Sequence, residues 1–169
     1  PGAFISAINH YNNMILGKDF NWLASSYWPG YKDPNAIGND FLGDTYGLYE
    51  SNKEKWLMGP HVKYLHNNIY KKIVKNKKVE GDRIKEIISG DVTNELATLF
   101  MSEAVKDIFT CNSVNMLYTS DAGIDVSDNY NEQERSTQAI NYGQILLGLM
   151  SLCKGGSMVT KQYTFFTEF

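Results

Sequence analysis

The sequence has few of the residues that hold small folds together through covalent bonds or metal ions. Cysteine occurs twice among 169 residues, and neither Cys111 nor Cys153 belongs to a CxxC pair or lies near a histidine in the sequence. This excludes a disulfide framework and a zinc site, and we expect both cysteines to be reduced, buried thiols. The three histidines also lack partners at metal-ligand spacing, so we expect no structural metal.

Long apolar runs and a large excess of charge are also missing. No stretch of eighteen apolar residues is present, so no membrane span is predicted. Sixteen Lys and Arg against nineteen Asp and Glu give a net charge of -3, which argues against coating of nucleic acid by bulk charge but allows a local basic patch. The composition, 43% hydrophobic with 14 glycines and 4 prolines, is that of a soluble globular protein. The length suits one domain that buries roughly 70% of its unfolded surface.

Apolar periodicity divides the sequence into alternating helix-like and strand-like segments, a pattern typical of an α/β fold. The strand at 113–121 is nearly all apolar, so we expect it to be parallel and covered on both faces. Residues 31–59 have no clear period and are expected to form a long irregular excursion, of the kind that is usually functional. Helices are expected over residues 3–14 (after a Pro-Gly turn), 61–78, 94–109 and 133–153, and strands over 19–29, 83–91, 113–121 and 157–166.

Three polar features fall at the carboxyl ends of expected strands. They are Gly90-Asp91, the segment from Ser120 to Gly123, and Lys161 within the final strand segment. Ligands of open parallel sheets bind outside the carboxyl ends of the strands, so we expect Asp121 and Lys161 to form a charge pair aimed at one substrate. Each residue taken alone has a structural alternative, because acids after strands often cap helices and lysines at strand ends are usually solvated.

Four motifs occur in a fixed order: PGAF (1–4), SGDVTN (89–94), TSDAGID (119–125) and KGGSMVTKQY (154–163). In this order they resemble the FtsJ-like, S-adenosylmethionine-dependent ribose 2'-O-methyltransferases. The resemblance is closest to the Adrift-type branch of eukaryotes and large DNA viruses, which methylates the messenger-RNA cap. It covers nearly all of the chain and implies a Rossmann-like methyltransferase sheet with helices on both faces. We expect a single domain over residues 1–169, with the first and the last strands of the sheet outside this sequence.

The resemblance implies a catalytic pair. Asp121 and Lys161 match the second and third members of a Lys-Asp-Lys-Glu tetrad. Lys161 would act as the general base that removes the proton of the ribose 2'-hydroxyl, and Asp121 would orient its ammonium group and stabilise positive charge near the sulfonium. The first lysine and the glutamate have no counterpart in this sequence, and Glu168 does not occupy the glutamate's place. No metal is required, because the sulfonium is already an activated methyl donor.

A binding site for S-adenosylmethionine is implied in the same way. The Pro-Gly turn matches the end of the family's first motif, where backbone approaches the methionine part of the cofactor, and Asp91 matches the acid that holds the adenine. Ser25 lies where many methyltransferases place a residue that binds the ribose. The residues implied to bind the cofactor are Pro1, Gly2, Ala3, Phe4, Ser25, Asp91, Val92 and Asp121.

RNA, most closely capped messenger RNA, is the implied substrate. Lys71, Lys72 and Lys75 are expected to neutralise phosphates, and Tyr31 to stack on a base or on the cap guanine. The alternatives are a solvated helix face for the lysines and a structural role for the aromatic ring. The implied location is intracellular, either cytoplasmic at a viral replication site or nuclear, and the sequence indicates no particular protein partner.

Other functions remain open at the level of the sequence. The spacing of Asp121, Asp125 and Asp128 is compatible with Mg²⁺ ligands of a phosphohydrolase. A nicotinamide-dependent oxidoreductase is poorly supported, because no GxGxxG motif is present. Two alternatives stay closer to the resemblance: a methyltransferase-like scaffold that binds cofactor or RNA without turnover, and a 2'-O-methyltransferase that acts on ribosomal RNA.

Overall fold

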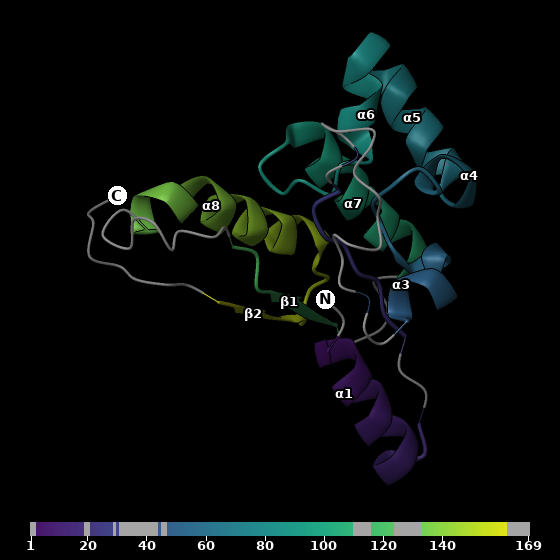
Figure 1. Cartoon of the computed structure of the whole chain (residues 1–169), viewed down its shortest axis with the longest axis vertical. Coiled ribbons are helices and arrows are strands. Elements are labelled where there is room, and N and C mark those ends of the chain that lie inside the picture. The colour runs from purple at the N-terminus through teal and green to yellow at the C-terminus, as the bar shows by residue number, and fades with distance from the viewer. Residues whose placement is uncertain are drawn as a thin grey trace. The chain divides into compact units, whose positions relative to one another are not determined.

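The computed structural model describes residues 3–18, 21–28, 30, 44, 47–109, 116–123 and 133–161. The chain forms two compact units, Pro1–Asp91 and Val92–Phe169, which run from purple to teal and from teal to yellow in Figure 1. Within the described ranges, no helix of either unit is long and apolar enough to cross a membrane. The expected single domain over residues 1–169 stays a prediction.

The first unit is mainly helical. The expected helix after the Pro-Gly turn is confirmed as α1, which continues as a turn of π-helix and ends at Gly17 in the left-handed conformation (φ 60°). The elements of this unit are α1 (Ala3–Tyr11), η1 (Asn12–Leu16), α3 (Leu48–Ser51), η3 (Lys53–Lys55), α4 (Val62–Leu65), α5 (Asn67–Lys77), η4 (Gly81–Arg83) and α6 (Ile84–Ile87).

The lysine-rich helix expected over residues 61–78 is divided into α4 and α5. The backbone leaves helical geometry at His66, which has φ -118° and ψ 37°. Val62 and Ile69 are buried, whereas Leu65 is exposed. A continuous helix would place Leu65 and Ile69 on one face, because residues four apart lie one turn from each other. The break therefore allows Ile69 to be buried without Leu65.

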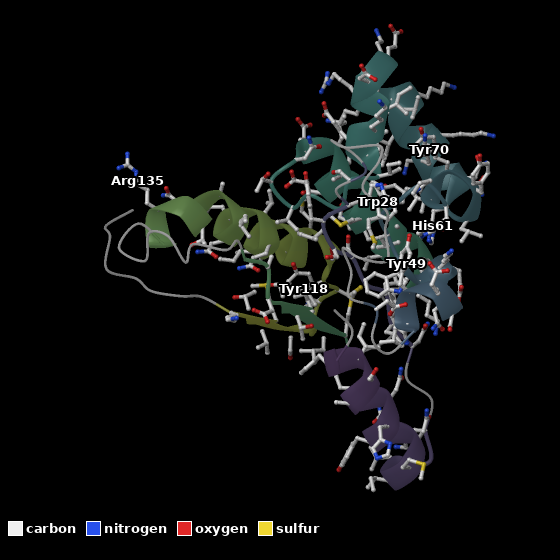
Figure 2. The ribbon with its side chains drawn as sticks, viewed as in Figure 1. Trp28, Tyr49, His61, Tyr70, Tyr118 and Arg135 are labelled. Atoms are coloured by element: carbon white, nitrogen blue, oxygen red, sulfur yellow. The ribbon has the colours of Figure 1, made fainter. Side chains whose placement is uncertain are left out.

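An aromatic cluster forms the core of the first unit. The ring centroids of Trp22 and Trp56 lie 6.3 Å apart, and those of Tyr49 and Trp56 lie 5.6 Å apart, both in the edge-to-face arrangement that ring quadrupoles favour. His61 lies beside Tyr49 (Figure 2), and its Nε2 atom is 3.0 Å from the carbonyl oxygen of Trp56. Burial raises the pKa of Tyr49 to about 12 and lowers the pKa of His61. The buried members of the cluster are Trp22, Tyr49, Trp56 and Met58.

The strand expected over residues 19–29 is not formed in the described part of that segment. Ala24 makes an isolated parallel bridge with Trp56. The N–H of Ala24 donates to the carbonyl oxygen of Lys55 (2.9 Å), and the carbonyl oxygen of Ala24 accepts from the N–H of Leu57 (2.8 Å). Trp22, a buried member of the aromatic cluster, and Ala24, which packs against that cluster, lie two residues apart, as on one face of a strand. The segment therefore has the alternation of a strand but lacks a continuous ladder, and the prediction of a strand is wrong here.

The strand expected over residues 83–91 is also wrong. Helix α6 occupies four residues of this segment and directly follows the single turn η4, which ends at Arg83. Ile84, Ile87 and Ile88 follow the i, i+3, i+4 spacing of a helix, and Ile87 and Ile88 are buried. An ion pair between residues three apart, Lys85 Nζ and Asp82 Oδ1 at 3.1 Å, is a further contact that suits a helical turn and not a strand.

The second unit combines helices with a parallel pair of strands. Its elements are α7 (Glu95–Ile108), β1 (Leu117–Ser120), α8 (Gln133–Ser151) and β2 (Ser157–Thr160). The expected helices over 94–109 and 133–153 are confirmed. Asn94 caps α7, because its side-chain oxygen accepts from the N–H groups of Leu96 (2.9 Å) and Ala97 (3.2 Å).

β1 and β2 pair in parallel, with Leu117 opposite Ser157 and Ser120 opposite Thr160. They are joined through α8, which packs against both strands and against α7, and Figure 1 shows α8 running along the pair. This is the crossover that parallel strands require. The described residues thus contain two parallel strands and the helix between them. The rest of a Rossmann-like sheet, with helices on both faces, stays a prediction.

The two faces of the strand pair differ in burial. Tyr118 and Met158 point toward α8, whereas Leu117 and Val159 are 51% and 61% exposed. The expectation that the strand at 113–121 is covered on both faces is therefore wrong for its described residues. On the covered face, a Cβ atom at Gly148 would overlap both Met158 and the ring of Tyr118, so the absence of a side chain at this position lets α8 lie close to the strands.

Cys153, just beyond the end of α8, is buried and disulfide-bonded. This corrects the expectation that it is a reduced thiol. The other cysteine of the sequence, Cys111, lies outside the described residues.

Candidate functional site

The parallel pairing of β1 and β2 places Asp121 and Lys161 together. Each residue directly follows the last residue of its strand, and the N–H of Lys161 donates to the carbonyl oxygen of Ser120 at 2.9 Å, which extends the ladder by one bond. The side chains then meet, with Nζ of Lys161 2.7 Å from Oδ1 of Asp121. The charge pair expected from the positions of these residues at strand ends is therefore present in the second unit.

The Asp121–Lys161 pair is open to solvent. The side chain of Lys161 is 53% exposed and that of Asp121 is 72% exposed. An ion pair of this kind contributes at most about 1 kcal/mol, and a nearby carboxylate favours the charged form of a lysine. A lysine that acts as a base beside this carboxylate must therefore lose water or meet a second cation when a substrate binds.

Gln144 of α8 lies beneath this pair and was not singled out from the sequence. Its side chain is completely buried. The amide oxygen accepts from the N–H of Ala122 at 3.2 Å, and the amide nitrogen donates to the carbonyl oxygen of Lys161 at 3.2 Å. One buried amide thus bonds to the backbone that follows both strands. A polar residue within the apolar stretch of a helix is the only sequence signal it leaves.

Asp91 ends the first unit and is partly buried. Its N–H donates to the hydroxyl oxygen of Ser89 at 3.2 Å, and that hydroxyl donates to the carbonyl of Glu86 at 2.7 Å. Trp28 bonds to the same turn, since its N–H donates to the carbonyl of Ser89 at 2.7 Å. The backbone that carries Asp91 is therefore anchored to α6 and to the segment containing Trp28.

Gly90 fixes how closely that segment approaches. Its φ is +64°, and a Cβ atom there would overlap the carbonyl oxygen of Ser26. The two polar regions predicted to bind cofactor in the first unit, around Ser25 and around Asp91, are thus adjacent through backbone contact. The side chain of Ser25 itself is exposed.

The remaining residues predicted to bind the cofactor lie on other elements. Ala3 and Phe4 begin α1, and the side chain of Phe4 is 59% exposed. Val92 opens the second unit, where its carbonyl oxygen accepts from Thr98 Oγ1 at 3.1 Å. Pro1 and Gly2 lie outside the described residues.

The lysines predicted to bind RNA lie on α5. Lys71, Lys72 and Lys75 are all exposed, and residues three and four apart on a helix share a face. A surface of this kind is able to bind phosphates, and it is equally compatible with a solvated helix face. Tyr31, the predicted stacking residue, lies outside the described residues.

The alternative magnesium site is not supported by a visible cluster. Asp125 and Asp128 lie outside the described residues. Among the residues that the structure does describe, no group of three His, Cys, Asp or Glu side chains is placed to hold a metal ion.

Comparison with known proteins shows similarity to viral and animal methyltransferases over nearly the whole chain. The sequence is 38% identical to a probable methyltransferase of African swine fever virus over 165 residues, 97% of this chain and 32% of that protein. It is 33% identical over 171 residues to an uncharacterized protein of Acanthamoeba polyphaga mimivirus, covering 99% of this chain and 17% of that protein. It is 26% identical over 167 residues to cap-specific mRNA (nucleoside-2'-O-)-methyltransferase 2 of Mus musculus, covering 98% of this chain and 18% of that protein.

The chain therefore spans about a third, or less, of the length of these relatives. It matches no protein-family model. No solved structure matches it either. The comparisons relate both compact units to proteins named as methyltransferases.

Proposed function

We propose that this protein transfers a methyl group from S-adenosylmethionine to a ribose 2'-hydroxyl at the cap of messenger RNA, as an FtsJ-like enzyme of the Adrift type. One observation carries the proposal: the Asp121–Lys161 pair, 2.7 Å apart at the carboxyl ends of two parallel strands. The similarity to methyltransferases, one of them named as acting on the mRNA cap, supports it.

The residues of the chain suit the cofactor chemically. S-adenosylmethionine supplies an activated methyl group on a positively charged sulfur. Asp121 provides a carboxylate whose negative charge suits a cation, and Asp91 provides one that can accept from an adenine amino group. The backbone at Gly90, free of a side chain, packs directly against Ser26, so the polar groups of this region are held in place. Ala3, Phe4, Ser25 and Val92 complete the proposed set, together with Pro1 and Gly2.

In the proposed mechanism, Lys161 accepts the proton of the ribose 2'-hydroxyl. The 2'-hydroxyl is a poor nucleophile, and its proton would have to leave as the oxygen bonds to the methyl carbon and that carbon separates from the sulfur of the donor. Lys161 Nζ in its neutral form accepts that proton, and Asp121 keeps the amine oriented before the step and stabilises the ammonium after it. Because the pair is exposed, the bound RNA has to exclude water from it before the amine is free to act. Positioning then supplies much of the rate.

RNA binding is assigned to the lysines of α5 and to Tyr31. Lys71, Lys72 and Lys75 would neutralise phosphates, and Tyr31 would stack on a base or on the cap guanine. A protein with this substrate acts inside the cell, either in the cytoplasm at a viral replication site or in the nucleus, and we include this location in the proposal.

The proposal is tested with the full-length protein, radiolabelled S-adenosylmethionine, and three RNAs: capped, capped with 2'-O-methyl groups already present, and uncapped ribosomal RNA. We expect label in the first only. Lys161→Ala and Asp121→Ala should lower the rate by at least about 100-fold, the usual scale for loss of a general base. Lys154→Ala, an exposed lysine in the turn before β2, is the matched control and should keep full activity.

Each competing function has its own result in this experiment. Normal methylation by both variants refutes the catalytic roles. Labelling of ribosomal RNA alone identifies the other RNA class as substrate. Binding of S-adenosylmethionine in calorimetry without any transfer identifies a scaffold. Phosphate release that depends on Mg²⁺ and stops with a chelator identifies a phosphohydrolase.

A further inference from the structure

The exposed Asp121–Lys161 pair cannot hold its own geometry. An ion pair in water contributes at most about 1 kcal/mol, and both side chains are more than half exposed. The two strands end at Ser120 and Thr160, so the positions of the two side chains depend on what holds the backbone just beyond. The N–H of Lys161 is bonded to Ser120. Gln144 supplies two further hydrogen bonds to the backbone at this point.

Gln144 joins the two chain segments through a single side chain. Its oxygen accepts from the N–H of Ala122, the residue directly after Asp121, and its nitrogen donates to the carbonyl of Lys161 itself. The same nitrogen also donates to Oδ1 of Asn141, one turn earlier in α8, at 3.2 Å. Both amide hydrogens and one oxygen lone pair are therefore used, and all three partners lie within the second unit.

The pattern of partners specifies an amide. The group must present an acceptor to an N–H on one side and two donors to oxygens on the other, which Gln provides and Glu, Met or Leu do not. Because the side chain is completely buried, a residue that leaves these groups unpaired has no water nearby to replace the lost bonds. The orientation of the amide follows from the same partners, since reversing it would set donor against donor.

The packing of α8 holds Gln144 at this depth. The hydroxyl of Tyr118, in β1, donates to the backbone carbonyl of Gln144 at 2.7 Å, and Figure 2 shows Tyr118 beneath α8. Burial raises the pKa of Tyr118, so this hydroxyl stays protonated and able to donate at neutral pH. On either side of Gln144, Gly143 and Gly148 lie too close to neighbouring atoms to carry a Cβ without a shift.

We propose that Gln144 is a positioning residue that sets the spacing of Asp121 and Lys161 by bonding the backbone after both strands to one buried amide. The inference rests on the proposed methyl transfer, because the consequence concerns the base in that reaction. Misplacement of a reacting group by about 1 Å can cost on the order of 100-fold in rate. Loss of the Gln144 bonds should therefore lower kcat while leaving substrate affinity nearly unchanged.

The test compares Gln144→Met with Gln138→Met in the full-length protein. Methionine keeps the length of the side chain and removes the amide, and Gln138 lies on the same helix and is partly exposed. With capped RNA, we expect Gln144→Met to lower kcat about 10- to 100-fold, with the KM for RNA and the Kd for S-adenosylmethionine changed less than about threefold. Gln138→Met should leave all three unchanged.

A double-mutant cycle separates positioning from general destabilisation. If Gln144 acts through Lys161, Gln144→Met should have no further effect on the residual rate of Lys161→Ala, whereas a merely structural role predicts that the two losses multiply. Multiplying losses, or a kcat for Gln144→Met equal to that of the unmodified protein, would overturn the proposal.

A second measurement does not depend on methyl transfer. The N–H of Ala122 should exchange slowly with D₂O in the unmodified protein and in Gln138→Met, and faster in Gln144→Met. Fast exchange in the unmodified protein overturns the role of Gln144 even if methylation is observed. If the unmodified protein methylates no RNA, the proposed function and the kinetic consequence both fail, while slow exchange at Ala122 would still establish that Gln144 holds this backbone.

Discussion

Gly148→Ala adds one methyl group where α8 packs against Tyr118 and Met158 of the strand pair, and two opposing terms decide its effect. Alanine is favoured over glycine in a helix interior by about 1 kcal/mol. Against this, the new Cβ would lie 2.5 Å from Sδ of Met158 and 2.8 Å from two carbons of the Tyr118 ring. Extra atoms in a packed site usually cost about 1–3 kcal/mol, so the sign depends on how far these neighbours can move.

Met158 is flexible, but the ring of Tyr118 is not free to withdraw. Its hydroxyl donates to the Gln144 carbonyl at 2.7 Å, so moving the ring away from α8 breaks a bond made by a partly buried group. We therefore place the steric cost in the upper half of its range, about 2–3 kcal/mol. After the gain in helix propensity, the net loss of stability is about 1–2 kcal/mol.

The assay is native-state hydrogen exchange of the amides of α8, read by mass spectrometry. A loss of 1.4 kcal/mol corresponds to about tenfold faster exchange through local opening. Ala139→Gly is the matched control, because Ala139 is exposed on the same helix and removal of its methyl group should cost only the propensity term, about 1 kcal/mol. Slower exchange in Gly148→Ala than in the unmodified protein would refute the reasoning, because it would mean that propensity outweighs the contact with Tyr118.

Two further outcomes are expected. Because burial raises the pKa of Tyr49 to about 12, the unfolded chain loses this proton first, near pH 10; the stabilisation is complete below pH 10 and is lost as the pH rises from about 10 to about 12. The unfolding temperature should therefore decrease between pH 10 and pH 12, and Tyr49→Phe should make this decrease smaller. An equal decrease in the variant and in the unmodified protein contradicts the raised pKa of Tyr49. Charge reversal at Lys71 and Lys75 together should weaken binding of capped RNA and reduce the salt dependence of that binding, without affecting cofactor binding in calorimetry. The control, Lys106→Glu on α7, should change neither RNA binding nor cofactor binding. Equal effects of the two changes would assign the α5 lysines to a solvated surface.

Long periodic segments were predictable from the sequence, and short ones were not. The helices α7 and α8 extend over 14 and 19 residues, enough for the spacing of apolar residues to distinguish a helix from a strand. The segment at 83–91 is short, so the i, i+3, i+4 spacing of Ile84, Ile87 and Ile88 is present in the sequence but covers too few residues to exclude a strand. The break at His66 depends on whether the core takes up Leu65 or Ile69.

The candidate site also has a part that was predictable from the sequence, the Asp121–Lys161 pair, and a part that was not, Gln144. Asp121 and Lys161 follow parallel strands, so topology alone brings them to one edge of the sheet, and the structure places them in contact. The role of Gln144 is not indicated by the sequence, because its partners include backbone atoms of Ala122 and Lys161. Backbone groups are the same at every residue, so no pattern of residue types in the sequence indicates which of them a distant side chain will meet.

The contact between Gly90 and Ser26 has a consequence for mutational tolerance. Gly17 and Gly90 both adopt positive φ, but a Cβ at Gly17 would meet open space, whereas at Gly90 it would overlap backbone. In a library of all single substitutions, position 17 should therefore retain asparagine, which tolerates the left-handed conformation. Position 90 should retain glycine alone. Position 90 would then be selected for the lack of a Cβ atom. A substitution there would impair the site while leaving the neighbouring carboxylate of Asp91 chemically unchanged.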